Sequence, residues 1–327
     1  MIRYFKSSFA VQYGLILLLG LLIWLPALIK PVGLVSFKGF NPLYDLLASA
    51  LSPFPLLLSI LGFALIFVQA FFFNAIISEN NLQNRVGSVG MLVYLLLFSR
   101  APELFGFTPV VFSTVFVLAT MHNLYQLYDS KNPIMPVFQA AFYAGMATLC
   151  YFPAVVLLVV IFGVLIITRT NGLREWLIPF FGFFTPFFFL ASWYFLNNEL
   201  IARYRDVLGL VVEFRYQFAG LPLPGLLFYL LVLVMLLAAL LWVNGNESDN
   251  SISTRKKVSI TMLMLLMFLA SAGFSGAHLS ANGLFIVPAA VFITYWASSA
   301  RRLRLANIMV LLLLALVLFS HYYRLFA

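Results

Sequence analysis

Six ionisable side chains are the residues of this chain best suited to chemistry. Two are carboxylates, which can act as general acids or bases, and the other four can bind a phosphate group or help to orient it. They are Asp45, Glu103, Arg100, Arg203, Arg205 and His278. An arginine fork matches the oxygens of a phosphate, while a carboxylate left free can accept a proton. The set predicts a site that holds a phosphate-bearing substrate beside a general base.

The alternative is that these charges are ordinary solvated loop residues. Exposed ion pairs contribute only about 0–1 kcal/mol, so charges at a wet surface need no function. Arg100 and Glu103 lie three residues apart between two apolar runs, and they share a face if this stretch is helical. Pro102 is compatible with that, because proline is tolerated in the first turn of a helix. Both interpretations place the two charges at a membrane boundary.

The elements that position these residues must be membrane helices. The chain is 64% hydrophobic and has 36 phenylalanines among its 327 residues, whereas soluble domains are roughly 45–50% apolar. Apolar runs of about 20 residues recur, each long enough to cross a hydrocarbon core of about 30 Å. We expect an all-α, polytopic transmembrane bundle in contact with lipids. The net charge of +9 then reflects the bias of basic residues toward cytoplasmic loops, and no nucleic-acid partner is expected.

About eleven spans are predicted, and together they form one integral-membrane domain over residues 1–327. The third predicted span is short, and a Tyr151-Phe152-Pro153 break between the fifth and sixth is interpreted as a turn. The spans are predicted at 11–29, 54–77, 87–99, 107–127, 136–151, 153–168, 176–196, 221–243, 258–273, 283–299 and 306–321.

The distribution of basic residues orients the chain. Arg3 and Lys6 place the N-terminus in the cytoplasm. With alternating loops, 12 of the 19 lysines and arginines fall on the cytoplasmic side, while the acidic residues divide evenly. The first apolar segment has a basic start but no small-x-small cleavage site, so an uncleaved first helix is expected. The predicted location is the inner membrane of a bacterium.

Two outer segments are predicted to be helices lying along the membrane surface. In residues 42–51, Asn41 can cap the helix, Pro42 suits its first position, and Asp45 lies beside a leucine stripe. The stripe consists of Leu43, Leu46, Leu47 and Leu51. The second segment covers about 198–213, and its apolar face contains Leu200, Ile201, Tyr204, Leu208 and Val211.

Several classes of chemistry have no motif in this sequence. Walker A, GxGxxG and HExxH patterns are missing, Cys150 is the one cysteine, and the three histidines are isolated. No metal or cofactor is therefore expected. The histidines (His122, His278 and His321) fit polar positions near membrane boundaries, and the amides Gln69, Asn74 and Gln139 fit hydrogen bonding between helices. No span has a central carboxylate, which argues against a proton-driven pump.

The whole chain resembles an uncharacterised family of integral membrane proteins from Bacteroidota. The segments that carry this resemblance are Met1–Phe5, Pro42–Asp45, Gln69–Asn74, Pro102–Leu104, Tyr151–Pro153 and Arg174–Trp176.

A second resemblance is to the GT-C glycosyltransferases, which use polyprenyl-phosphate sugars. Ala144–Val155 is similar to their glycine-bearing span, outer turn and proline-led return span. The similarity covers about residues 1–200, with additional spans at about 221–321. It implies a polyprenyl-phosphate-sugar donor, with Asp45 as general base and Glu103 assisting. The donor phosphate would be held by the basic residues Arg100, Arg203, Arg205 and His278.

The chain departs from the GT-C pattern at two places. Its first outer loop has one acidic residue, where those enzymes often have adjacent ones, and Tyr151-Phe152 precedes the proline instead of a basic residue. Two other functions therefore stay open. One is a non-enzymatic scaffold or assembly factor that binds another envelope protein, and the other is a transporter or flippase for an amphipathic lipid. A hydrophobic groove beside Asp45 would favour the transferase, and a filled bundle with separated outer charges would favour the scaffold.

Overall fold

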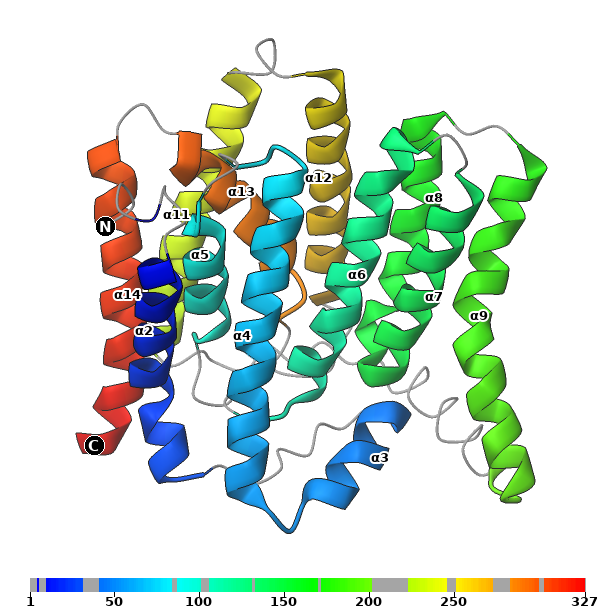
Figure 1. Ribbon diagram of the computed structural model, residues 1–327, viewed down its shortest axis with the longest axis horizontal. Coiled ribbons are helices and arrows are strands. Elements are labelled where there is room, and N and C mark those ends of the chain that lie inside the picture. The colour runs from blue at the N-terminus through cyan, green and yellow to red at the C-terminus, as the bar shows by residue number, and fades with distance from the viewer. Residues whose placement is uncertain are drawn as a thin grey trace.

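The fold of the chain is entirely helical in the part that the computed structural model describes. The described residues are 5, 10–31, 41–83, 87–100, 106–130, 133–169, 172–201, 223–245, 251–272, 283–299 and 303–326. Every regular element within these ranges is a helix, as the sequence predicted (Figure 1).

Each predicted span overlaps one observed helix, except that the span predicted at 153–168 overlaps the short 3₁₀ segment η2 together with α8. Within the described ranges, six helices are long and apolar enough to cross a membrane, namely α2, α4, α6, α9, α11 and α14. The full count of eleven spans stays a prediction. The helices are α2 (Ala10–Ile29), α3 (Pro42–Leu51), α4 (Pro55–Glu79), α5 (Val89–Phe98), α6 (Pro109–Asp129), α7 (Ile134–Cys150), η2 (Phe152–Val155), α8 (Val156–Thr168), α9 (Leu173–Leu196), α11 (Leu223–Gly245), α12 (Ile252–Ala272), α13 (Ile286–Ser299) and α14 (Leu303–Phe326).

Apart from the short helix α3, and with η2 and α8 taken as one element, successive helices run in opposite directions between two ends of the bundle (Figure 1). The end at the bottom of Figure 1, where α3 lies, is called the α3 end. Tyr151 has an extended backbone, with φ −153° and ψ 106°, and separates α7 from η2 and α8. Because α7 and α8 contact each other along the bundle, the break is a turn between two helices and not a kink in one span.

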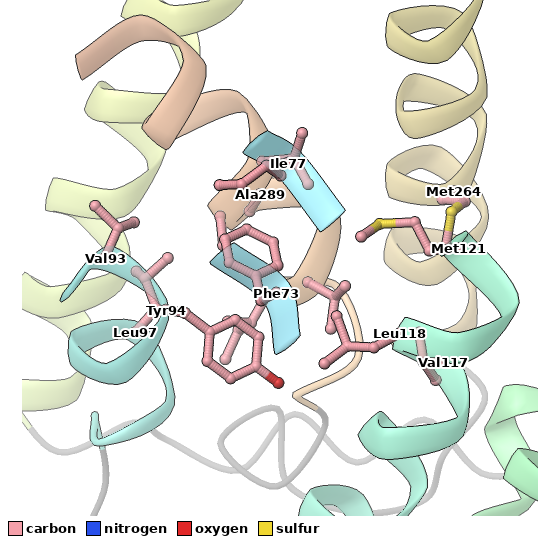
Figure 2. Packing of buried hydrophobic residues seen from close by; sticks show 14 of the residues in the cluster. Phe73, Ile77, Val93, Tyr94, Leu97, Val117, Leu118, Met121, Met264 and Ala289 are labelled. Atoms are coloured by element: carbon pink, nitrogen blue, oxygen red, sulfur yellow. The ribbon is translucent and has the colours of Figure 1, made fainter. Parts of the chain in front are cut away.

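Two short helices, α5 and α13, form the centre of the bundle. All residues of α5 are buried, and so is every residue of α13 before Ser299. They contact each other, and α4, α6 and α12 close around them. In Figure 2, Phe73 of α4, Tyr94 of α5 and Ala289 of α13 lie in one cluster, with Leu118 and Met264 at its side. Since neither short helix faces lipid, neither has to match the membrane thickness.

Buried amide side chains join the central helices, as predicted for Gln69 and Asn74. The Tyr94 hydroxyl donates to the Gln69 side-chain oxygen at 3.0 Å, and the Gln69 amide donates to the Val111 carbonyl at 2.7 Å. At the start of α5, the Met91 N–H donates to the Asn74 side chain at 3.3 Å. A helix that begins inside a bundle cannot reach water, so side chains from its neighbours must satisfy its first N–H groups.

Helices α7 and α9 cross closely through small residues. A Cβ on Gly145 would overlap the Phe183 carbonyl oxygen, and a Cβ on Gly182 would lie 2.7 Å from the Phe138 carbonyl oxygen and 2.9 Å from the Ala141 Cβ. Backbones approach this closely in membrane bundles because packing, rather than the hydrophobic effect, holds helices together in lipid. The crossing fixes α9, which has most of its surface turned outward.

The outward surface of α9 also matches the dimensions of a membrane. Large apolar side chains are exposed along it, including Phe189 with 66% of its surface accessible. Trp176 near its start and Trp193 near its end are 17 residues apart, which corresponds to about 25 Å along a helix. Tryptophans prefer the two membrane interfaces, which bound a hydrocarbon core of about 30 Å. The lipid-facing length of α9 therefore fits one bilayer.

Candidate functional site

Helix α3 has the bounds that the sequence predicted, from Pro42 to Leu51. Pro42 occupies the first turn, and the Asp45 N–H donates to the Asn41 carbonyl at 2.8 Å. The predicted side-chain cap is wrong, because the Asn41 side chain makes no capping hydrogen bond. Its ψ of 56° departs from the extended backbone from which a capping side chain reaches the first free N–H groups. The helix start therefore depends on proline and on backbone bonding.

The face of α3 that packs on the bundle is centred on Tyr44 and Ala48, both buried. The predicted leucine stripe does not form this face. Leu46 has 56% of its surface accessible, while Leu47 is half-buried. Asp45 is exposed beside Tyr44. Leucines at a membrane surface can be covered by lipid, so they need not point at the protein.

Tyr44 attaches α3 to the turn that precedes α6. Its hydroxyl donates to the Phe107 carbonyl at 2.9 Å, and the two rings stack with centroids 5.7 Å apart. The same turn contacts α4 through two glycines, because a Cβ on Gly62 would overlap the Gly106 backbone. Gly106 has φ +114°, a conformation that glycine adopts far more easily than other residues. Tyr44 and Gly62 thus hold this turn from two sides.

The turn before α6 is recessed from the end of the molecule. Gly62 lies seven residues beyond Pro55, the first residue of α4, which corresponds to about 10 Å along the helix axis. The turn that contacts Gly62 therefore stops well short of the end of α4. Helix α3 contacts α4 and α7 and lies below the lower end of α6 in Figure 1. Asp45 is presented on the exposed side of this covering helix.

Arg100 lies in the interior of the bundle, although the sequence placed it in an outer turn. Only 4% of its surface is accessible. Its guanidinium carbon is 5.4 Å from the ring centroid of Tyr229 on α11 and 5.8 Å from that of Phe285 before α13. Aromatic faces attract a guanidinium, more strongly where water is excluded. Arg100 thus joins the end of α5 to α11 and to the segment before α13, both from the C-terminal half of the chain.

Ser99, the residue before Arg100, is buried as well. The Trp24 indole N–H donates to the Ser99 hydroxyl at 3.1 Å, and the His321 Nε2 donates to the Ser99 carbonyl at 2.6 Å. His321 was predicted to be a polar residue at the membrane boundary, but it is buried. Its partner lies 222 residues earlier in the chain, so no local sequence pattern could have identified the contact.

The described contacts of Asp45's helix and of Arg100 involve different parts of the bundle. Helix α3 packs on α4, α7 and Phe107, whereas Arg100 lies against Tyr229, Phe285 and the end of α14. The other four predicted site residues, and most of the second predicted surface helix, lie outside the described residues. They are Glu103, Arg203, Arg205 and His278. A single site formed by all six residues stays a prediction.

The contact between Tyr44 and Phe107 is expected to release at high pH. Burial, together with the negative charge of Asp45, raises the pKa of Tyr44 to about 12. The hydroxyl therefore donates throughout the physiological range, and its contribution to stability is lost as the pH rises from about 10, the value of an unperturbed tyrosine, toward 12. A nitroxide attached to a cysteine at Ser49, an exposed residue of α3, should gain mobility in that interval. The same mobility step in Tyr44→Phe would contradict this assignment.

No protein-family model, no curated protein and no solved structure matches this chain. The functional interpretation of this helical membrane protein therefore depends on its own residues and their geometry.

Proposed function

We propose that the protein is an inner-membrane glycosyltransferase of the GT-C kind, which uses a polyprenyl-phosphate-linked sugar at the α3 end. The observation that carries this proposal is the exposed carboxylate of Asp45 on α3, a short surface helix that Tyr44 fastens to the bundle. A lipid-linked substrate keeps its reacting bond near the membrane surface, and Asp45 is presented at such a surface. The leucines beside it are available for contact with lipid.

In this proposal Asp45 removes the proton from an acceptor hydroxyl. The acceptor oxygen then bonds to the anomeric carbon of the sugar, while the bond from that carbon to the phosphate oxygen breaks. Polyprenyl phosphate leaves with the electron pair, so the step requires no cofactor. Glu103 would assist by orienting the acceptor, and the leaving phosphate would be held by Arg203, Arg205 and His278. Arg100 is assigned to the interior instead, because its guanidinium lies against two aromatic rings.

A second candidate function is a membrane scaffold or assembly factor that binds an envelope protein. The observation in its favour is the filled centre, where α5 and α13 are buried along nearly their whole lengths. The different surroundings of Asp45 and Arg100 also fit this candidate, since a scaffold does not need its charges to converge. The two candidates differ in their dependence on a lipid phosphate, which only the transferase requires.

Binding of undecaprenyl phosphate, the leaving product of the proposed reaction, separates the two functions. The purified protein is mixed in detergent with undecaprenyl phosphate, undecaprenol or phosphatidylglycerol, and retained lipids are counted by native mass spectrometry. The transferase should retain undecaprenyl phosphate in preference to both other lipids, because it recognises a phosphate and a long chain together. Equal retention of undecaprenyl phosphate and phosphatidylglycerol would reject the transferase and favour the scaffold.

The proposed orientation places the α3 end outside the cytoplasm. Reporter fusions after Arg174, Lys257 and Arg304 are expected to read cytoplasmic, whereas fusions after Lys38 and Arg215 should read external. The reason is the excess of basic residues in the loops of the opposite end. An external reading after Lys257 would invert the second half of the topology.

A further inference from the structure

Helix α3 is attached to the bundle by a small part of its surface. Three of its ten residues are buried, namely Pro42, Tyr44 and Ala48, whereas all ten residues of the equally long α5 are buried. The four leucines of α3 are half-buried or exposed. Leucines that leave the protein at a membrane surface are covered by lipid, so the hydrophobic effect does not hold α3 in place. Close packing and hydrogen bonding must do so.

The contact of Tyr44 with Phe107 provides both of these interactions. The Tyr44 hydroxyl donates to the Phe107 carbonyl at 2.9 Å, and the two rings stack with centroids 5.7 Å apart. A tyrosine at a membrane surface has an alternative, because its ring is favoured at the level of the lipid headgroups and its hydroxyl can bond to water there. Release of α3 therefore exchanges one hydrogen bond for another and leaves no polar group of Tyr44 unsatisfied.

The connection between α3 and α4 allows α3 to move. It consists of Ser52, Pro53 and Phe54, all of which are exposed. At this end the Phe54 N–H donates to the Leu51 carbonyl at 3.0 Å, a bond within the connection itself and not to the rest of the bundle. Because three residues join the two helices, a released α3 would turn about this connection and stay near the same membrane surface.

Such a turn would carry Asp45 with it. Asp45 follows Tyr44 directly and lies on the exposed side of α3. While Tyr44 is bound to Phe107, the carboxylate is held beside the recessed turn that precedes α6. Release of Tyr44 would move the carboxylate away from this turn.

We propose that α3 exchanges between a docked and a released position, and that the contact of Tyr44 with Phe107 is the latch that sets their ratio. The consequence for catalysis rests on the proposed function, in which the docked position holds the general base Asp45 in place and the released position withdraws it. Tyr44 is then a positioning residue, because it acts through Asp45. The exchange itself is independent of the reaction and would also occur in the scaffold.

Pulsed electron spin resonance can measure the two positions of α3. Nitroxides are attached to cysteines at Ser49 of α3 and at Ser259 of α12, both exposed, while the native Cys150 is buried. The wild type should show a major docked and a minor released distance. Tyr44→Phe keeps the ring but loses the hydroxyl, and it should raise the ratio of released to docked protein about fivefold, the effect of one hydrogen bond of average strength.

Ser52→Ala is the matched control for the latch. It also removes a hydroxyl group, but that hydroxyl donates to the Ser49 carbonyl within the same end of α3. The ratio of released to docked protein should therefore stay at the wild-type value. The same distance distribution in wild type and Tyr44→Phe, or an equal shift in Tyr44→Phe and Ser52→Ala, would overturn the latch.

Sugar transfer by the same variants separates failure of the latch from failure of the proposed function. The transfer rate of Tyr44→Phe and Tyr44→Ala should fall in proportion to the docked fraction that spin resonance measures, and thermal unfolding shows whether both variants stay folded. A wild-type rate in a variant with a mostly released α3 would overturn the positioning role but keep the transferase. The expected shifts in a wild-type protein without transfer activity would keep the latch and reject the transferase.

Discussion

Asp45→Asn should abolish sugar transfer while the amount of folded protein stays unchanged. Asparagine has nearly the same shape but cannot accept the proton, and a general base typically contributes about 10²–10⁴-fold to a rate. Asp45 is exposed on α3, so its replacement by a side chain of the same shape leaves no cavity in the bundle. The measurement is consumption of a radiolabelled polyprenyl-phosphate sugar by proteoliposomes, with thermal unfolding of the same preparation.

Ser49→Ala provides the matched control for that experiment. Ser49 is exposed one turn further along α3, and its hydroxyl donates to the Leu46 carbonyl of the same helix. Its replacement should leave the rate at the wild-type level. Wild-type activity in Asp45→Asn would remove the carboxylate from the mechanism, and the scaffold would then be the better interpretation of the fold.

Gly145→Leu is expected to destabilise the bundle strongly, because it forces α7 and α9 apart. The new side chain would overlap the Phe183 carbonyl oxygen, and its Cβ would also lie 3.2 Å from the Pro186 ring. The obstacle includes backbone, so a rotation of one side chain cannot relieve it. Overpacking of a well-filled interior costs about 1–3 kcal/mol, and a backbone clash belongs at the upper end. The measurement is the thermal unfolding midpoint in detergent, together with the yield of inserted protein.

Gly14→Leu is the control for this substitution. Gly14 also lies inside an apolar helix, but a Cβ built on it has no neighbouring atom within 4 Å. The same residue change should therefore have little effect there. Equal unfolding midpoints for Gly145→Leu and wild type would show that α7 and α9 are not held together by this crossing.

The helices were predictable because their signals are local. Long apolar runs located the spans, and Pro42, at the first position of α3, marked the start of the surface helix. The buried face of α3 was not predictable from the leucine pattern, because its determinant is the contact between Tyr44 and Phe107, 63 residues apart. Lipid can cover the leucines that a soluble protein would have to bury.

The candidate site was predictable in part for the same reason. Asp45 lies on the expected surface helix, because amphipathic spacing and a helix start are visible in the sequence. Arg100 was expected at the outer membrane boundary, either in a wet turn or in the phosphate site, since a charge between two apolar runs usually marks a loop. The structure buries it because α5 is only ten residues long and ends inside the bundle. The rings that receive its guanidinium belong to α11 and to the segment before α13, which no local pattern connects to α5.

The enclosure of α5 also determines the order in which the molecule can be completed during synthesis. The carbonyl groups just after its last turn bond to His321 and Ser320 on α14, more than 200 residues later in the chain. When α5 leaves the ribosome, these partners do not yet exist, and α13, which packs along its side, is also still to come. The first half of the protein is therefore inserted into the membrane before the packing partners at the centre of the bundle have been synthesised. Helix α14 is made after all of these elements, so the core is sealed only once α14 has entered the membrane.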